Sequence, residues 1–242
     1  MPRPDGRKAD ELRPVVLTAG ISKWAEGSCQ VEFGDTIVLC TASVEESQPR
    51  FRRDTPLGWV TAEYDMLPRS TKERRQRTTA GSRPDSRSLE ISRLIGRSLR
   101  SIVDFAILGP RTITLDCDVL QADGGTRTAA ITGAWVAMSE AVEFLMSKKA
   151  LKANPIKDSV AAISVGVVSG EELLDLCYVE DSRAAVDFNV VMTGRKRLIE
   201  LQGTGEDRPF GRDLLDRMLN LAELGVEQLT AVQQRTLAAE SD

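Results

Sequence analysis

The sequence predicts an α+β fold, with mixed sheets and βαβ-type crossovers, in which two similar halves pack as one domain over residues 1–242. Segments that alternate between apolar and polar residues, as half-buried strands do, precede segments with the 3.6-residue period of a helix. This strand, strand, helix order occurs once in each half, although no residue-level repeat relates the halves. Right-handed crossovers would then place the two halves around a shared sheet.

The strands of the first half follow from alternation. Residues 113–120 alternate clearly, with their apolar side chains on one face. Residues 28–33 and 36–41 are two more expected strands, and the Gly-Asp pair between them is typical of a tight type II′ hairpin. A further short strand is expected over residues 61–66.

Two helices complete this half. Residues 88–108 place an apolar stripe at helical spacing, opposite a stripe of arginines. Residues 128–148 lack proline, are rich in Ala, Met and Glu, and repeat apolar residues with the helical period. Arg87 stands at the start of the first helix, where its guanidinium and the helix dipole can act on one anion.

A glycine-rich turn, Gly124-Gly125-Thr126-Arg127, separates the strand over 113–120 from the second helix. Such a turn presents free backbone N–H groups and the positive end of the helix dipole, a combination that binds phosphate. Arg127 adds a cationic fork that matches phosphate oxygens. Two glycines alone would merely turn the chain, but Thr and Arg at the helix entrance favour an anion site.

The second half begins with two expected strands, over 160–168 and 172–179. Two more follow over 188–193 and 198–202. Pro209 then sits where a helix would begin. Two amphipathic helices are expected after it, separated by Gly225.

Two aspartates flank one turn of this half. Asp181 follows the strand over 172–179, and Asp187 lies at the start of the next strand. Asp181 alone could simply cap the turn. Asp187 lies between Val186 and Phe188, so its carboxylate requires an arginine, a hydrogen-bond donor or a metal. Two aspartates across one turn can share a Mg²⁺ ion.

Positive charge is concentrated between residues 69 and 87. Seven Arg and Lys residues face two acidic ones there, a net charge of +5, which leaves −9 for the rest of a chain whose net charge is −4. With few apolar residues, the segment is expected to be a mobile surface loop. It could serve solubility alone, but a basic patch on an acidic protein better fits a nucleic-acid backbone.

Composition excludes several kinds of chemistry. The chain has no histidine, so Ser-His-Asp and Cys-His catalysis are excluded. The four cysteines lie in apolar strand patterns without metal-ligand spacing, which indicates buried free thiols in a reducing compartment. No apolar run of membrane-spanning length and no signal core are evident, so a soluble, intracellular protein is expected.

These residues together resemble the ribonuclease PH family of phosphorolytic exoribonucleases. The resemblance spans nearly the whole chain. Its motifs are Arg3-Pro-Asp-Gly-Arg7, Glu11-Leu-Arg-Pro14, Gly34-Asp35-Thr36, Met66-Leu-Pro-Arg69, the stretch 90–100, the stretch 116–127, the stretch 180–187 and Gln202-Gly-Thr-Gly-Glu206. One position departs from the family pattern, because Ser86 stands where glycine is expected before the phosphate-binding arginine.

The resemblance implies a ribonuclease PH-like fold and a function as a tRNA nucleotidyltransferase. Such an enzyme removes 3′ nucleotides from tRNA precursors and other RNA 3′ ends, using inorganic phosphate and releasing nucleoside diphosphates. By resemblance, the phosphate-binding residues are Arg87, Gly125, Thr126 and Arg127. The catalytic, Mg²⁺-associated residues are Asp181 and Asp187. The RNA-binding residues are Arg69, Arg74, Arg75 and Arg77.

The resemblance also implies a cytoplasmic homo-hexamer built as a trimer of dimers, with no membrane contact. Phosphate is then the nucleophile, so that positioning and charge neutralisation replace a histidine base. Two alternatives remain. One is a catalytically silent, RNA-binding ring subunit of an exosome-like assembly. The other is a small-molecule phosphotransferase that uses the glycine-rich turn.

Overall fold

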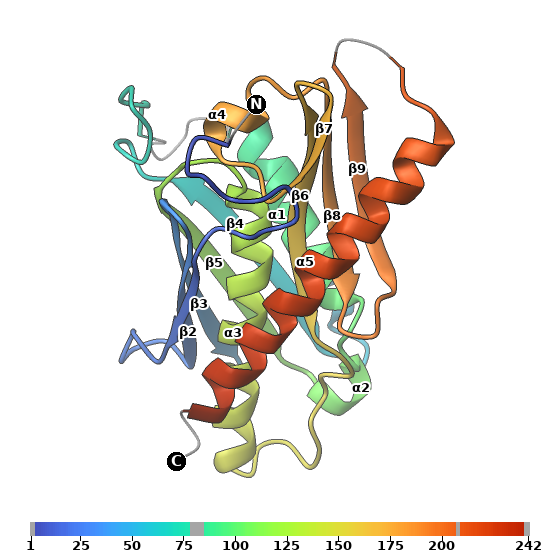
Figure 1. Ribbon diagram of the computed structural model, residues 1–242. Coiled ribbons are helices and arrows are strands. Elements are labelled where there is room, and N and C mark those ends of the chain that lie inside the picture. Colours follow the sequence, from blue (N-terminus) through green and yellow to red (C-terminus); the bar gives the residue numbers. More distant parts are fainter. Residues whose placement is uncertain (1–2, 78–84, 207–208, 240–242) are drawn as a thin grey trace.

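The computed structural model describes residues 3–77, 85–206 and 209–239. It contains two sheets with a long helix between them (Figure 1). The first sheet has the order β1-β2-β3-β5-β4 and the second the order β7-β6-β8-β9. The α+β fold class predicted from the sequence is confirmed.

The first sheet is mixed. Its strands are β1 (Val15–Ala19), β2 (Gly27–Phe33), β3 (Thr36–Glu45), β4 (Trp59–Met66) and β5 (Thr112–Gln121). All neighbours pair antiparallel except β4 and β5, which are parallel and joined through α1 (Ser86–Arg100) and the short α2 (Phe105–Leu108). The expected hairpin is present between β2 and β3, where Phe33 pairs with Thr36 and Gly34 has a φ of 55°.

The second sheet is antiparallel throughout. Its strands are β6 (Val160–Val168), β7 (Glu171–Leu174), β8 (Val186–Thr193) and β9 (Leu198–Gly205). Two features therefore differ from the prediction. Each half has its own sheet rather than a shared one, and the βαβ crossover occurs only in the first half.

Helix α3 (Thr126–Ser147) packs against β2 and β3 on one side and β6 on the other. Helix α5 (Arg212–Ala239) crosses the second sheet (Figure 1) and also contacts β1. One continuous hydrophobic cluster joins both sheets and α3. Its fully buried members include Phe33, Leu115, Ile131, Met138, Ile163 and Phe188. This shared core holds the two halves at a fixed relative position.

Helix α3 is long and apolar enough to cross a membrane by length and composition, but 72% of that stretch is buried inside the protein. Its apolar character is that of a central core helix, consistent with its place between the sheets. All four cysteines are buried and none forms a disulfide, as predicted, although Cys177 caps the helical turn over residues 178–181 rather than lying in a strand.

Three predicted elements are wrong in their boundaries. Helix α5 runs through Gly225 without a break, because the missing side chain allows close packing: a Cβ there would lie 2.8 Å from Leu174 Cδ1. The predicted helix over 88–108 is interrupted after α1, and Asp104 caps α2 by accepting hydrogen bonds from the N–H groups of residues 106 and 107.

The third error concerns the expected strand over 172–179. Strand β7 ends at Leu174, and residues 178–181 form a helical turn, α4 (Tyr178–Asp181). Asp175 has a φ of 55°, which turns the chain out of the strand direction. Asp181 therefore ends a helical turn rather than a strand.

Candidate active site

Residues from both halves line one cavity of about 630 Å³. The first half contributes the glycine-rich turn and the start of α1, and the second contributes α4 and the start of β8. All six residues predicted for phosphate binding and catalysis line it: Arg87, Gly125, Thr126, Arg127, Asp181 and Asp187. Residues that are far apart in the sequence thus meet in one place, although their roles stay predictions.

The glycine-rich turn has the geometry of an anion-binding helix start. Gly124 and Gly125 have φ angles of 77° and 66°, and α3 begins at Thr126. No side chain of the described chain caps this N-terminus, so its first N–H groups and the helix dipole remain available to an anion. Tyr64 Oη donates to Thr126 Oγ1 at 2.8 Å and fixes that side chain.

Arg127 and Arg87 add positive charge at this helix start. Arg127 Nη1 donates to Gln202 Oε1 at 2.7 Å and contacts Glu90 Oε1 at 3.3 Å. These bonds connect α3 to β9 and α1, and hold the guanidinium at the cavity wall. Arg87 lies in the first turn of α1, as predicted, where its backbone N–H donates to Asp85. Both charges oppose the rise that burial causes in the pKa of Asp181.

The two aspartates lie on adjacent elements, Asp181 at the end of α4 and Asp187 as the second residue of β8. Burial and then the charge of Asp181 raise the pKa of Asp187 to about 6, against the opposing charge of Arg127. Asp187 Oδ1 is buried without a hydrogen-bond partner among the described residues. Its Oδ2 has only a long contact, 3.5 Å, to Asn189 Nδ2.

This arrangement fits a hard divalent cation. The buried Asp187 oxygen lacks a donor, and a second carboxylate and an amide lie on the same wall. No group of three or more acidic, Cys or His ligands occurs in the part of the chain that the structure describes. Mg²⁺ commonly uses one or two carboxylates and completes its shell with water and substrate phosphate. Asp181 and Asp187 therefore suit Mg²⁺ bound together with a phosphate-bearing substrate.

Part of the basic segment, residues 69–87, lines the cavity. Arg75 and Lys72 line the cavity, and Arg75 Nη2 lies 2.9 Å from Asp85 Oδ2. Arg69 is exposed and donates to the carbonyl of residue 72. Arg74 and Arg77 are also exposed, outside the cavity lining. Residues 78–84 of the expected mobile loop lie outside the described residues.

Sequence reasoning missed two residues that line this cavity and one that supports it from behind. Tyr64 fixes Thr126, and Ser164 and Asn189 line the wall. Two of them had a signal. Ser164 is a polar residue inside the otherwise apolar strand β6. Asn189 follows Asp187 by two residues in β8, so the side chains of Asp187 and Asn189 lie on the same face of that strand. Tyr64 occupies an inward position of β4 and resembles an ordinary core aromatic.

The fold is shared with solved exosome proteins. Rice (Oryza sativa) Rrp46 superposes with a TM-score of 0.78 at 20% identity, covering 97% of this chain and 100% of the other. The Archaeoglobus fulgidus exosome with RNA bound to the active site contains a similar chain, with a TM-score of 0.77, 23% identity and coverage of 95% and 91%. An archaeal exosome core matches with a TM-score of 0.75, 21% identity and coverage of 96% and 91%.

Family models match both halves. The model for domain 1 of the 3′ exoribonuclease family, of the ribonuclease PH type, covers residues 11–142. The model for domain 2 covers residues 158–224. The chain therefore belongs to the ribonuclease PH family of 3′ exoribonucleases, as its motifs predicted. The first model ends near the end of α3 and the second begins just before β6, on either side of the boundary between the two sheets.

Asp187 is expected to destabilise the fold when it is ionised. Because the folded protein disfavours the carboxylate, the free energy of unfolding falls as the pH rises from 3.8 through about 6. In metal-free buffer at pH 8, Asp187→Asn should raise the free energy of unfolding by about 1–3 kcal/mol. Urea unfolding should show this gain shrinking towards pH 4. The exposed Asp54→Asn is the control, with no comparable gain. A less stable Asp187→Asn protein at pH 8 would mean that a buried partner needs the charge.

Proposed function

We propose that this protein is a phosphorolytic 3′→5′ exoribonuclease. It removes nucleotides from the 3′ ends of tRNA precursors, with inorganic phosphate as co-substrate and nucleoside diphosphates as products. The observation that supports this most strongly is the meeting, in one cavity, of an uncapped helix N-terminus, two arginines and two carboxylates. The first two features suit an incoming phosphate, and the carboxylates suit a Mg²⁺ ion or a proton placed at the scissile phosphodiester.

Phosphate is a suitable nucleophile for a site without histidine. A hydrolase must deprotonate water, whereas phosphate is already an anion at neutral pH. The site then needs to orient phosphate in line with the scissile bond and to offset the charge of two phosphoryl groups. The N–H groups at the start of α3, Arg127 and Arg87 can do both. Tyr64 would keep Thr126 in place as phosphate binds.

Asp181 and Asp187 would act at the leaving 3′ oxygen. Mg²⁺ held by these carboxylates would supply charge neutralisation there. Alternatively, Asp187 could itself donate the proton, since a pKa of about 6 leaves part of its population protonated near neutral pH. The two roles have opposite pH dependence: a metal ligand must be ionised, whereas a proton donor must be protonated.

RNA would approach along the basic segment. Arg75 and Lys72 stand at the cavity wall, and Arg69, Arg74 and Arg77 extend the positive surface away from it. Tyr178 lines the cavity and is 55% exposed, so its ring can stack on a base near the 3′ end. The proposal also includes the cytoplasmic homo-hexamer that the family resemblance implies.

The product of the reaction tests this function. Incubated with a tRNA precursor, phosphate and Mg²⁺, the protein should release nucleoside diphosphates, as measured by chromatography. Arg127→Ala should raise the phosphate concentration needed for half-maximal rate about ten- to a hundredfold, since a charge-assisted hydrogen bond contributes about 1.5–3 kcal/mol. RNA affinity, measured by filter binding, should change little.

Each alternative gives a different result. Nucleoside monophosphates formed without phosphate would show hydrolysis. RNA binding with no nucleotide release would show a silent RNA-binding subunit. Phosphate transfer to a small molecule without RNA would show a phosphotransferase. Any of these would contradict the proposed function.

The basic segment should supply RNA affinity. Replacing Arg74 and Arg77 together by Ala should reduce the slope of log affinity against log salt by about 0.7–0.9 for each RNA phosphate that is no longer neutralised. Filter binding over a range of salt concentrations measures the slope. Arg235→Ala, an exposed position near the C-terminal end of α5, is the matched control and should leave the slope unchanged. An unchanged slope in the double variant would place the RNA on another surface.

A further inference from the structure

Behind the cavity, the N-terminal segment inserts arginines among buried carboxylates. Residues 3–13 run beside α4, in dark blue in Figure 1. Arg3 and Arg13 each have a side chain only 3% exposed, and they pair with Glu180 and Asp175, which are 4% and 0% exposed. These four residues do not line the cavity. We call residues 3–13 the clasp.

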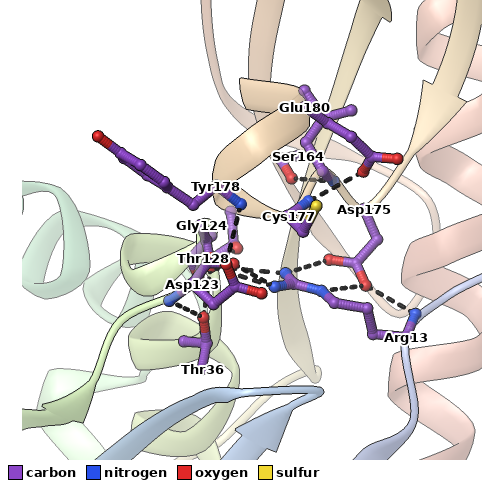
Figure 2. A network of polar contacts seen from close by, with 12 residues as sticks. Arg13, Thr36, Asp123, Gly124, Thr128, Ser164, Asp175, Cys177, Tyr178 and Glu180 are labelled. Carbon is purple, nitrogen blue, oxygen red and sulfur yellow. Dashed lines mark hydrogen bonds and ion pairs between the residues drawn. The ribbon is translucent and has the colours of Figure 1, made fainter. Parts of the chain in front are cut away.

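Arg13 joins the two sides of the site. Its Nη2 and Nε donate to the two carboxylate oxygens of Asp175, at 2.7 and 3.0 Å, and its backbone N–H donates to the same carboxylate at 2.8 Å. Its Nη1 donates to the carbonyl of Asp123 at 2.6 Å. Figure 2 shows the guanidinium between the carboxylate and the glycine-rich turn. One side chain therefore connects the second half to the turn that starts α3.

Thr36 anchors the same turn from β3. Its Oγ1 donates to the carbonyl of Gly124 at 2.6 Å and accepts from the backbone N–H of Asp123 at 2.9 Å (Figure 2). In a planar trans peptide, a carbonyl and the next N–H point in opposite directions. Fixing the carbonyls of Asp123 and Gly124 towards Arg13 and Thr36 therefore directs the following N–H groups, of Gly124 and Gly125, away from them.

The other end of the clasp acts on α4. Arg3 Nε and Nη2 donate to the two oxygens of Glu180, at 2.7 and 2.8 Å. Glu180 also accepts from the backbone N–H of Cys177 at 3.0 Å, which caps the turn. Burial would raise the pKa of Glu180, but the bonds from Arg3 and Cys177 and the charges of Arg3 and Arg7 lower it. Asp181 is the next residue, so the capped turn sets its position.

From these contacts we propose that the clasp positions the phosphate-binding turn against the aspartate-bearing turn, and that Arg13 sets phosphate affinity without touching phosphate. The proposal rests on the phosphate site of the proposed function. Buried ion pairs contribute little net stability compared with apolar replacements, but well-matched ones can select one geometry. Arg3 and Arg13 are matched in this way, with two hydrogen bonds each to their carboxylates, whereas Arg7 Nη2 is buried without a hydrogen-bond partner among the described residues. Lysine cannot replace Arg13, because one ammonium cannot hold both a bidentate carboxylate and the Asp123 carbonyl.

Titration calorimetry with inorganic phosphate tests this without RNA or turnover. Arg13→Lys, which keeps the charge, should raise the dissociation constant for phosphate about tenfold or more, as expected for a misplaced hydrogen-bonding turn. Thr36→Val, which is close in shape, removes the second anchor of the turn and should act in the same direction. Thr36→Val also keeps the proposal testable if the Arg13→Lys variant does not fold. Circular dichroism checks folding.

A variant in the core separates positioning from stability. Leu229→Ala removes a fully buried side chain of α5 and should lower the melting temperature while leaving phosphate affinity unchanged. Unchanged phosphate affinity in folded Arg13→Lys and Thr36→Val would overturn the clasp proposal and leave the proposed function standing. No phosphate binding by the wild-type protein would overturn both.

Discussion

The site depends on a backbone contact between the two halves at Gly124. A Cβ at this position would lie 2.7 Å from the carbonyl oxygen of Leu176 and 2.8 Å from the backbone nitrogen of Tyr178. Only glycine allows the turn before α3 to approach the start of α4 this closely. The contact brings the uncapped helix N-terminus and the two aspartates to one cavity. A bulkier residue would push the glycine-rich turn of the first half away from α4 of the second half, and so widen the cavity that both line.

Charge is arranged around this contact in two layers. Behind it, Arg3 and Arg13 of the clasp hydrogen-bond both oxygens of the buried carboxylates of Glu180 and Asp175. In the cavity the charges are incompletely matched: Asp187 has a buried oxygen without a donor, and its pKa rises to about 6. Such unmatched groups cost stability in the free protein and favour ligands that complete them. A divalent cation and a phosphate anion are the ligands that this pattern fits.

Much of this architecture could be predicted from local patterns. The strands β2, β3 and β5 alternate, α3 has a clear period, and the motif at 124–127 already indicated a phosphate site. Asp187 stood out as an acid in an apolar strand. The errors arose where contacts between distant residues, rather than local sequence, determine where a helix or strand ends. Gly225 resembles a helix break until its packing on Leu174 is seen, and strand β7 ends early because Asp175 turns to meet Arg13. The clasp pairs residues more than 160 positions apart, which no local pattern reveals.

A crystal structure determined with inorganic phosphate and Mg²⁺ tests the central claim most directly. We expect one phosphate at the start of α3, with oxygens about 3 Å from the N–H groups of that turn and from the Arg127 guanidinium. We also expect a cation between Asp181 and Asp187. Phosphate bound only on the basic segment, or an empty cavity at saturating phosphate, would contradict the assignment of this cavity as a phosphorolytic site.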